Sequence, residues 1–182
     1  MPLPLGLKLL LAVLVVTAGV CDVLWRRIPN WLTAPALLSG LVINVALGPG
    51  RAPGGKQAAA GAGLAFLVYF GLYLLAGKGA GDVKLMAAVG AIVGWKNWLA
   101  IFVFSSLLGG VIALALALAK NRLRQTLFNM GVILWELAHL RSPARRHEEL
   151  RIESARALTL PHGAVVALGC LFFLGSGWLA GS

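Results

Sequence analysis

Two aspartates, Asp22 and Asp82, are the residues of this sequence whose type and setting suit catalysis. Each adjoins a long apolar run, where a carboxylate is costly to bury and points to a function by default. Two carboxylates a few ångströms apart do not both ionise cheaply, so one keeps its proton while the other stays charged. Such a pair can activate water for attack on a peptide carbonyl, with one member as base and the other as acid. This chemistry needs no metal ion and no cofactor, and we expect neither.

Two other interpretations of the aspartates fit the same spacing. In the first, they form structural ion pairs: Asp22 is spaced to pair with Arg26 along a helix. Asp82 is likewise spaced to pair with Lys78 or Lys84. In the second, they line a proton or cation pathway, as intramembrane carboxylates often do. The protein would then be a small proton- or ion-coupled membrane transporter.

The composition is that of a membrane protein. Of the 182 residues, 59% are hydrophobic and 12% are charged, and the mean hydropathy is +0.87. Soluble domains keep about a quarter of their residues charged. The net charge of +10 is carried by cations between the apolar runs, as topology signals are, so we expect no nucleic-acid partner. Cys21 and Cys170 form no CxxC pair, so no zinc or redox motif is present. We expect one membrane domain over residues 1–182, with the lipid bilayer as its surroundings.

Six apolar segments predict an all-α, polytopic integral membrane protein with about six transmembrane helices. Between the first two segments, Pro29 disfavours helical geometry in the residue before it, and we expect Asn30 to cap the next helix. The Gly/Pro-rich residues 48–56 are expected to form a loop and residues 95–98 a turn. At the start of the last segment, Pro161 is expected in the first helical turn. The predicted spans are residues 3–24, 31–47, 57–76, 82–94, 99–119 and 158–180.

The orientation in the membrane follows from a basic segment at about residues 120–157. Within it, residues 127–140 are apolar but too short to span, so we expect an interfacial helix there. Basic loops face the cytoplasm, and six spans then place twelve of the sixteen Lys and Arg residues on that side. The same count brings Asp22 and Asp82 to one membrane depth near the cytoplasm, where they could face each other.

Three segments resemble a known family. Residues 79–85, Gly-Ala-Gly-Asp-Val-Lys-Leu, match the GxGDxKL signature of bacterial type IV prepilin peptidases, which are intramembrane aspartyl proteases. Asp22, followed by the Arg-Ile-Pro-Asn of residues 27–30, resembles the family's first catalytic aspartate and its downstream turn. Residues 160–164, Leu-Pro-His-Gly-Ala, resemble the segment that opens the family's last helix. The matches follow the family's order along nearly the whole chain.

The resemblance implies an aspartic-type endopeptidase of the bacterial inner membrane, with its active site toward the cytoplasm. Its substrates would be the signal segments of prepilins or pseudopilins, whose leader is cut at the membrane face. Asp22 and Asp82 carry over as the catalytic pair. An extended substrate segment is expected to bind beside them by main-chain hydrogen bonds. The resemblance assigns substrate-binding or loop-shaping roles around this pair to Gly79, Gly81, Lys84, Pro29 and Asn30.

The sequence departs from the pattern of the family at two points, the first of which separates it from the large members. Those members have an additional N-terminal region with paired CxxC motifs and also methylate the new N-terminus. This sequence has no CxxC motif and is similar to the short members that serve Flp-type, or tight-adherence, pili. We therefore expect no methyltransferase activity. His162 stands where the family often has an aromatic residue, and we expect a structural role for it.

Overall fold

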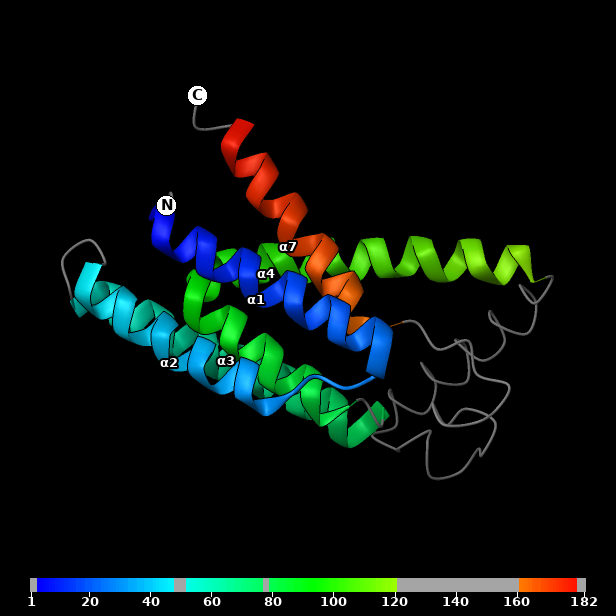
Figure 1. Ribbon diagram of the computed structural model, residues 1–182, viewed down its shortest axis with the longest axis horizontal. Helices are drawn as coiled ribbons and strands as arrows, with labels where there is room; N and C mark the ends of the chain where they lie inside the picture. Colours follow the sequence, from blue (N-terminus) through cyan, green and yellow to red (C-terminus); the bar gives the residue numbers. More distant parts are fainter. Residues whose placement is uncertain (1–2, 48–51, 77–78, 121–160, 180–182) are drawn as a thin grey trace.

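The computed structural model describes residues 3–47, 52–76, 79–120 and 161–179, and every element within these segments is an α-helix. The fourth helix is interrupted at Gly94, so the described chain contains six helical segments (Figure 1). The all-α prediction is therefore confirmed, whereas the predicted interfacial helix at residues 127–140 lies outside the described residues. The helices are α1 (Leu5–Trp25), α2 (Asn30–Leu47), α3 (Ala52–Ala76), α4 (Ala80–Ala119) and α7 (His162–Leu179).

Four predicted boundaries were wrong by a few residues. Helix α3 begins at Ala52, inside the segment expected to be a loop, because proline is tolerated in a first helical turn. Asn30 is the first residue of α2 and not its cap, since the carbonyl of Pro29 already accepts the Thr33 N–H. Residues 95–98 are helical, and the interruption lies one residue earlier. Helix α7 begins directly after Pro161 rather than before it.

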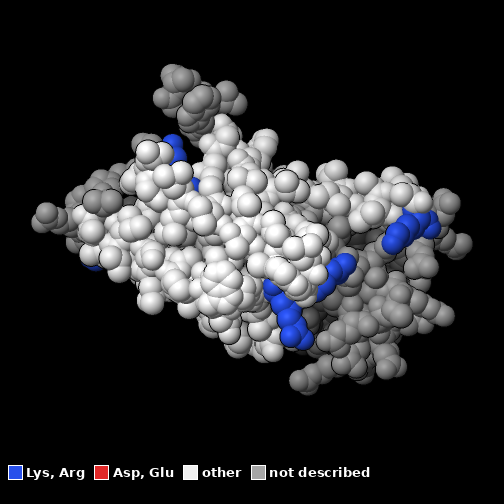
Figure 2. All heavy atoms as spheres, in the orientation of Figure 1, with Lys and Arg blue, Asp and Glu red and all other residues white. Residues whose placement is uncertain are grey.

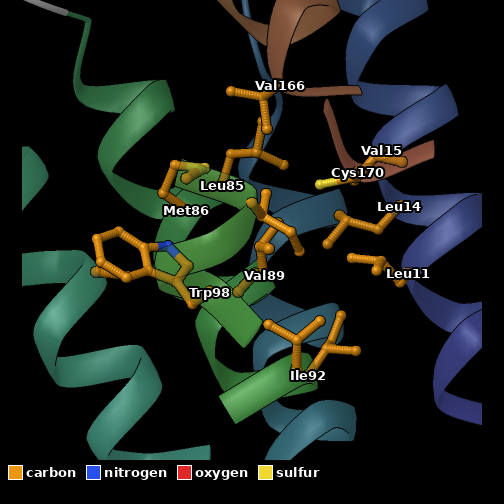
Figure 3. Packing of buried hydrophobic residues seen from close by; sticks show 14 of the residues in the cluster. Leu11, Leu14, Val15, Leu85, Met86, Val89, Ile92, Trp98, Val166 and Cys170 are labelled. Atoms are coloured by element: carbon orange, nitrogen blue, oxygen red, sulfur yellow. The ribbon is translucent and has the colours of Figure 1, made fainter. Parts of the chain in front are cut away.

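The first half of α4, residues 80–93, lies at the centre of the bundle. Between Val83 and Gly94 every residue is buried except Lys84. A helix that is apolar on all sides is typically a buried one. Side chains from α1, α7 and the second half of α4 surround it (Figure 3). The labelled residues of this packing are Leu11, Leu14, Val15, Leu85, Met86, Val89, Ile92, Trp98, Val166 and Cys170.

Gly94 separates the two halves of α4, with φ 76° and ψ 167°, a conformation that favours glycine. The interruption leaves backbone carbonyls without helical partners, which is costly in a nonpolar interior. Two side-chain amides compensate for this loss. Nδ2 of Asn44, on α2, donates to the carbonyls of Ala91 and Ile92, at 3.0 Å each. Nδ2 of Asn97 donates at 3.1 Å to the carbonyl of the residue before Gly94.

Helices α3 and α4 approach closely through glycine. Gly61 of α3 faces Gly90 of α4, and a Cβ on either residue would overlap the backbone of the other. In a membrane the surrounding lipid is as apolar as the helices, so association depends on close packing of this kind. The absence of side chains at Gly61 and Gly90 therefore sets the distance between the two helices.

The outer surface of the bundle is also apolar. Leu5, Val42 and Leu67 are 72%, 65% and 68% exposed. Figure 2 shows Lys and Arg side chains at the margins of one face, with a broad uncharged surface between them. Among the described residues, three helices are long and apolar enough to cross a membrane: Leu5–Trp25, Gly54–Leu74 and Ala80–Ala119. With the shorter apolar helices Asn30–Ala46 and His162–Ser176, these form a polytopic membrane protein.

The glycine contact predicts that the same Gly→Ala substitution affects stability differently at two positions on α3. Gly61→Ala places a Cβ 2.8 Å from the Trp95 backbone nitrogen, whereas Gly63 has nothing within 4 Å. We expect Gly61→Ala to destabilise the protein by about 1–3 kcal/mol, as overpacking does. Gly63→Ala should be neutral or slightly stabilising because alanine favours helix. Thermal unfolding of both variants in detergent measures this. Equal midpoints would show that the helices do not meet at Gly61.

Candidate active site

Asp22 lies in the last turn of α1 and is 8% exposed. Its Oδ2 accepts a hydrogen bond of 2.7 Å from the backbone N–H of Gly163, the second residue of α7. The first N–H groups of a helix have no partner within the helix and are good donors to a carboxylate. A Cβ at residue 163 would lie 3.0 Å from the Asp22 Cβ and 3.1 Å from Oδ2. The glycine therefore allows the start of α7 to contact the carboxylate.

Asp82 lies in the first turn of α4 and is partly buried. Its backbone N–H donates to the carbonyl of Gly79 at 3.1 Å, so the two residues form the turn that starts the helix. Gly79 has an extended backbone, with φ −66° and ψ 138°. A Cβ on Gly79 would lie 3.8 Å from the Asp82 Oδ2, so the glycine borders the carboxylate.

Tyr69 of α3 connects the surroundings of the two aspartates. Its hydroxyl lies 3.2 Å from Nε2 of His162, the residue before Gly163. Tyr69 also lies within electrostatic range of the Asp82 carboxylate. Hydrogen bonds therefore link Asp22 to Gly163 and His162 to Tyr69, and the Tyr69 phenol lies within electrostatic range of Asp82. Four helices contribute to this one region of the bundle.

The turn between α1 and α2 packs against the segment that carries Asp82. Nζ of Lys84 donates to Oδ1 of Asn30 at 2.9 Å. A Cβ on Gly81 would lie 3.2 Å from the Cβ of Ile28. Pro29, between these contact residues, supplies the carbonyl that begins α2. The structure thus brings the two segments named from the sequence into direct contact.

Sequence analysis did not single out Tyr69, and it gave His162 only a structural role. One signal for Tyr69 was available: buried tyrosine hydroxyls usually have a hydrogen-bond partner, and Tyr69 stands within a long apolar run. The identity of that partner, 93 residues away, was not available from the sequence. Within the described segments, no group of three or more His, Cys, Asp or Glu residues is arranged to hold a metal ion. Cys21 and Cys170 are buried free thiols.

The fold and the site define a polytopic helical membrane protein with an aspartate at the start of one helix and another at the end of a neighbouring one. A model of the type IV leader peptidase family matches residues 9–114 of the 182. This match covers more than half of the chain, including both aspartates. The protein belongs to the type IV leader peptidase family, as the motifs in the sequence predicted.

Curated relatives agree with this family. Proteins named prepilin leader peptidase/N-methyltransferase are similar in Aeromonas salmonicida strain A449, with 39% identity over 120 residues, and in Escherichia coli K12, with 32% over 149 residues. These matches cover 62% and 74% of this chain. They span 40% of the length of the Aeromonas protein and 66% of the Escherichia coli protein. No solved structure matches the chain.

The contact between residues 28 and 81 predicts a disulfide in a double variant. In a Cys21→Ala, Cys170→Ala background, the double variant Ile28→Cys with Gly81→Cys should form a disulfide readily. The Cβ positions of residues 28 and 81 are 3.2 Å apart, close to the separation of about 3.8 Å in disulfides. Maleimide labelling of free thiols measures disulfide formation: labelling should be lost on oxidation and restored by a reductant. Ile28→Cys with Gly63→Cys is the control and should keep both thiols. Equal labelling of the two variants before and after oxidation would show that the segments are not in contact.

Proposed function

We propose that the protein is an intramembrane aspartyl endopeptidase that removes the leader from type IV, Flp-like prepilins or pseudopilins. The observation that carries the proposal is that, in a member of the leader peptidase family, Asp22 is hydrogen-bonded to the start of α7 while Tyr69, bonded to the same helix start, lies within electrostatic range of Asp82. The printed names of the relatives in Aeromonas salmonicida and Escherichia coli support the same activity.

In this proposal Asp22 and Asp82 share the work of a two-carboxylate hydrolase. The ionised carboxylate takes a proton from a bound water, and the water oxygen forms a bond to the scissile carbonyl carbon. The protonated carboxylate donates its proton as the tetrahedral intermediate forms. The C–N bond then breaks, and the amine leaves with a proton from the pair. The reaction consumes one water and needs no covalent enzyme intermediate.

The substrate would bind along the segment that precedes Asp82. Gly79 has an extended backbone beside the Asp82 carboxylate, and such a backbone can pair with an extended peptide. Gly81 packs on Ile28, and a Cβ at residue 81 would require a shift of a few tenths of an ångström. The hydrogen bond between Lys84 and Asn30 ties this segment to the turn after α1. We propose that these contacts, with Pro29 starting α2, keep the binding segment in place.

The cytoplasmic face of the bacterial inner membrane is the proposed side of cleavage. Arg26 and Arg27 follow Asp22 and are exposed, as is Lys84 after Asp82. Cations at the ends of membrane helices favour the cytoplasmic side. These three residues therefore support a site that opens toward the cytoplasm. A prepilin leader, which precedes the apolar segment of the prepilin, would be accessible there.

Replacing each aspartate with asparagine, which has the same shape but no ionisable group, tests the proposal. We expect Asp22→Asn and Asp82→Asn each to lower leader cleavage by about 10²- to 10⁴-fold, the usual contribution of an acid or base group. The measurement is the mobility shift of a candidate prepilin reconstituted with purified enzyme in liposomes.

Accumulation in the membrane and the thermal midpoint in detergent control for folding of both variants. Normal cleavage by either folded variant would exclude a catalytic pair of aspartates. A wild-type protein that cleaves no candidate prepilin but carries a proton or cation current that both variants lose would favour a transporter instead.

A further inference from the structure

Tyr69 is a polar side chain fixed deep within the bundle. It is 2% exposed, and its ring meets that of Phe102 edge-on, with centroids 6.1 Å apart and an interplanar angle of 82°. Phe102 in turn stacks on the fully buried Trp98, at 5.4 Å. Aromatic pairs in these arrangements add stability beyond the area that they bury. The second half of α4 therefore holds the Tyr69 ring against movement.

The hydroxyl of this fixed ring is bonded to the start of α7. Tyr69 Oη and His162 Nε2 are 3.2 Å apart, and the two ring centroids are 5.8 Å apart. His162 is the first residue of α7, and the next residue, Gly163, donates its N–H to Asp22. A rotation or shift of the first turn of α7 would alter both hydrogen bonds together. The direction of the Gly163 N–H is therefore linked to the hydroxyl of Tyr69.

The phenol of Tyr69 also lies within electrostatic range of the Asp82 carboxylate. One rigid ring thus contacts the helix start that binds Asp22 and lies close to Asp82. Carboxylates that act as a pair must keep their separation, because a displacement of about 1 Å can lower a reaction rate about 10²-fold.

We propose that Tyr69 and His162 are a positioning pair: the hydrogen bond between them fixes the start of α7, and through it Asp22, relative to Asp82. The inference rests on the proposed peptidase function and adds two residues to it. Neither residue takes part in the chemistry. They act on the rate through the placement of Asp22, and the substrate-binding segment before Asp82 is left unchanged.

A single-atom change separates this role from packing. Tyr69→Phe removes the hydroxyl and keeps the ring that packs on Phe102. We expect kcat for leader cleavage to fall about tenfold, the effect of losing one hydrogen bond, with KM changed less than twofold. Tyr73→Phe is the matched control, the same change one turn along α3 at a residue that is 40% exposed. It should keep wild-type kcat.

The pair is tested as a unit by a double-mutant cycle. His162→Phe should lower kcat to a similar extent as Tyr69→Phe. The double variant should lose about tenfold and not about a hundredfold, because the second change removes a bond that is already absent. Multiplied losses in the double variant would overturn the pairing, and wild-type kcat in Tyr69→Phe would overturn the inference while leaving the peptidase function in place.

Hydrogen exchange gives a readout that does not need cleavage. In nanodiscs, the amides at the start of α7, including that of Gly163, should exchange about tenfold faster in Tyr69→Phe than in the wild type or Tyr73→Phe. Unchanged exchange in Tyr69→Phe would overturn the inference even if no prepilin substrate is found. Faster exchange without any cleavage by the wild type would support the pair and contradict the proposed function.

Discussion

The hydrogen bond from the Gly163 N–H to Asp22 Oδ2 is the interaction on which the site depends. A carboxylate that is 8% exposed must have a hydrogen-bond donor, because an unpaired buried charge is strongly destabilising. The donor here is a backbone group, so α7 itself has to reach α1. Gly19 permits this approach, since a Cβ there would lie 3.1 Å from the Cβ of Ala167. The close crossing of α1 and α7 is therefore what supplies Asp22 with its hydrogen-bond donor.

A second constraint comes from the length of the first half of α4. Residues 80–93 cover about 21 Å at 1.5 Å per residue, less than the hydrocarbon core of about 30 Å. At least one end of this half-helix must then lie at membrane depth. Irregular backbone is tolerated there when protein surrounds it. Gly94 is buried and its neighbouring carbonyls are bonded by Asn44 and Asn97, which meets this condition at one end. At the other end is Asp82.

The sequence was sufficient to predict the helical class and an interruption near Gly94. It also predicted one membrane depth for the two aspartates, and the structure brings the turn after Asp22 into contact with the segment that carries Asp82. The sequence was not sufficient to predict how each helix is rotated. In a soluble helix the polar face would reveal this, but here both faces are apolar: Leu9 is 58% exposed and Leu11 is fully buried. The hydrogen bonds of Asn44 to residues 91 and 92 were not predicted either, because they depend on how α2 is rotated toward α4. Glycines, amides and tyrosines within apolar runs carry more information about packing than the apolar residues do.

The settings of the two aspartates differ in a way that suits the proposed chemistry. Asp22 is buried and bonded to the start of α7, whereas Asp82 is only partly buried, near Tyr69 and Gly79. In carboxylate pairs that hydrolyse bonds, unequal surroundings are what separate the acid from the base. The inequality has a structural origin: Asp22 lies in the last turn of α1, where the start of α7 covers it, whereas Asp82 lies in the first turn of α4.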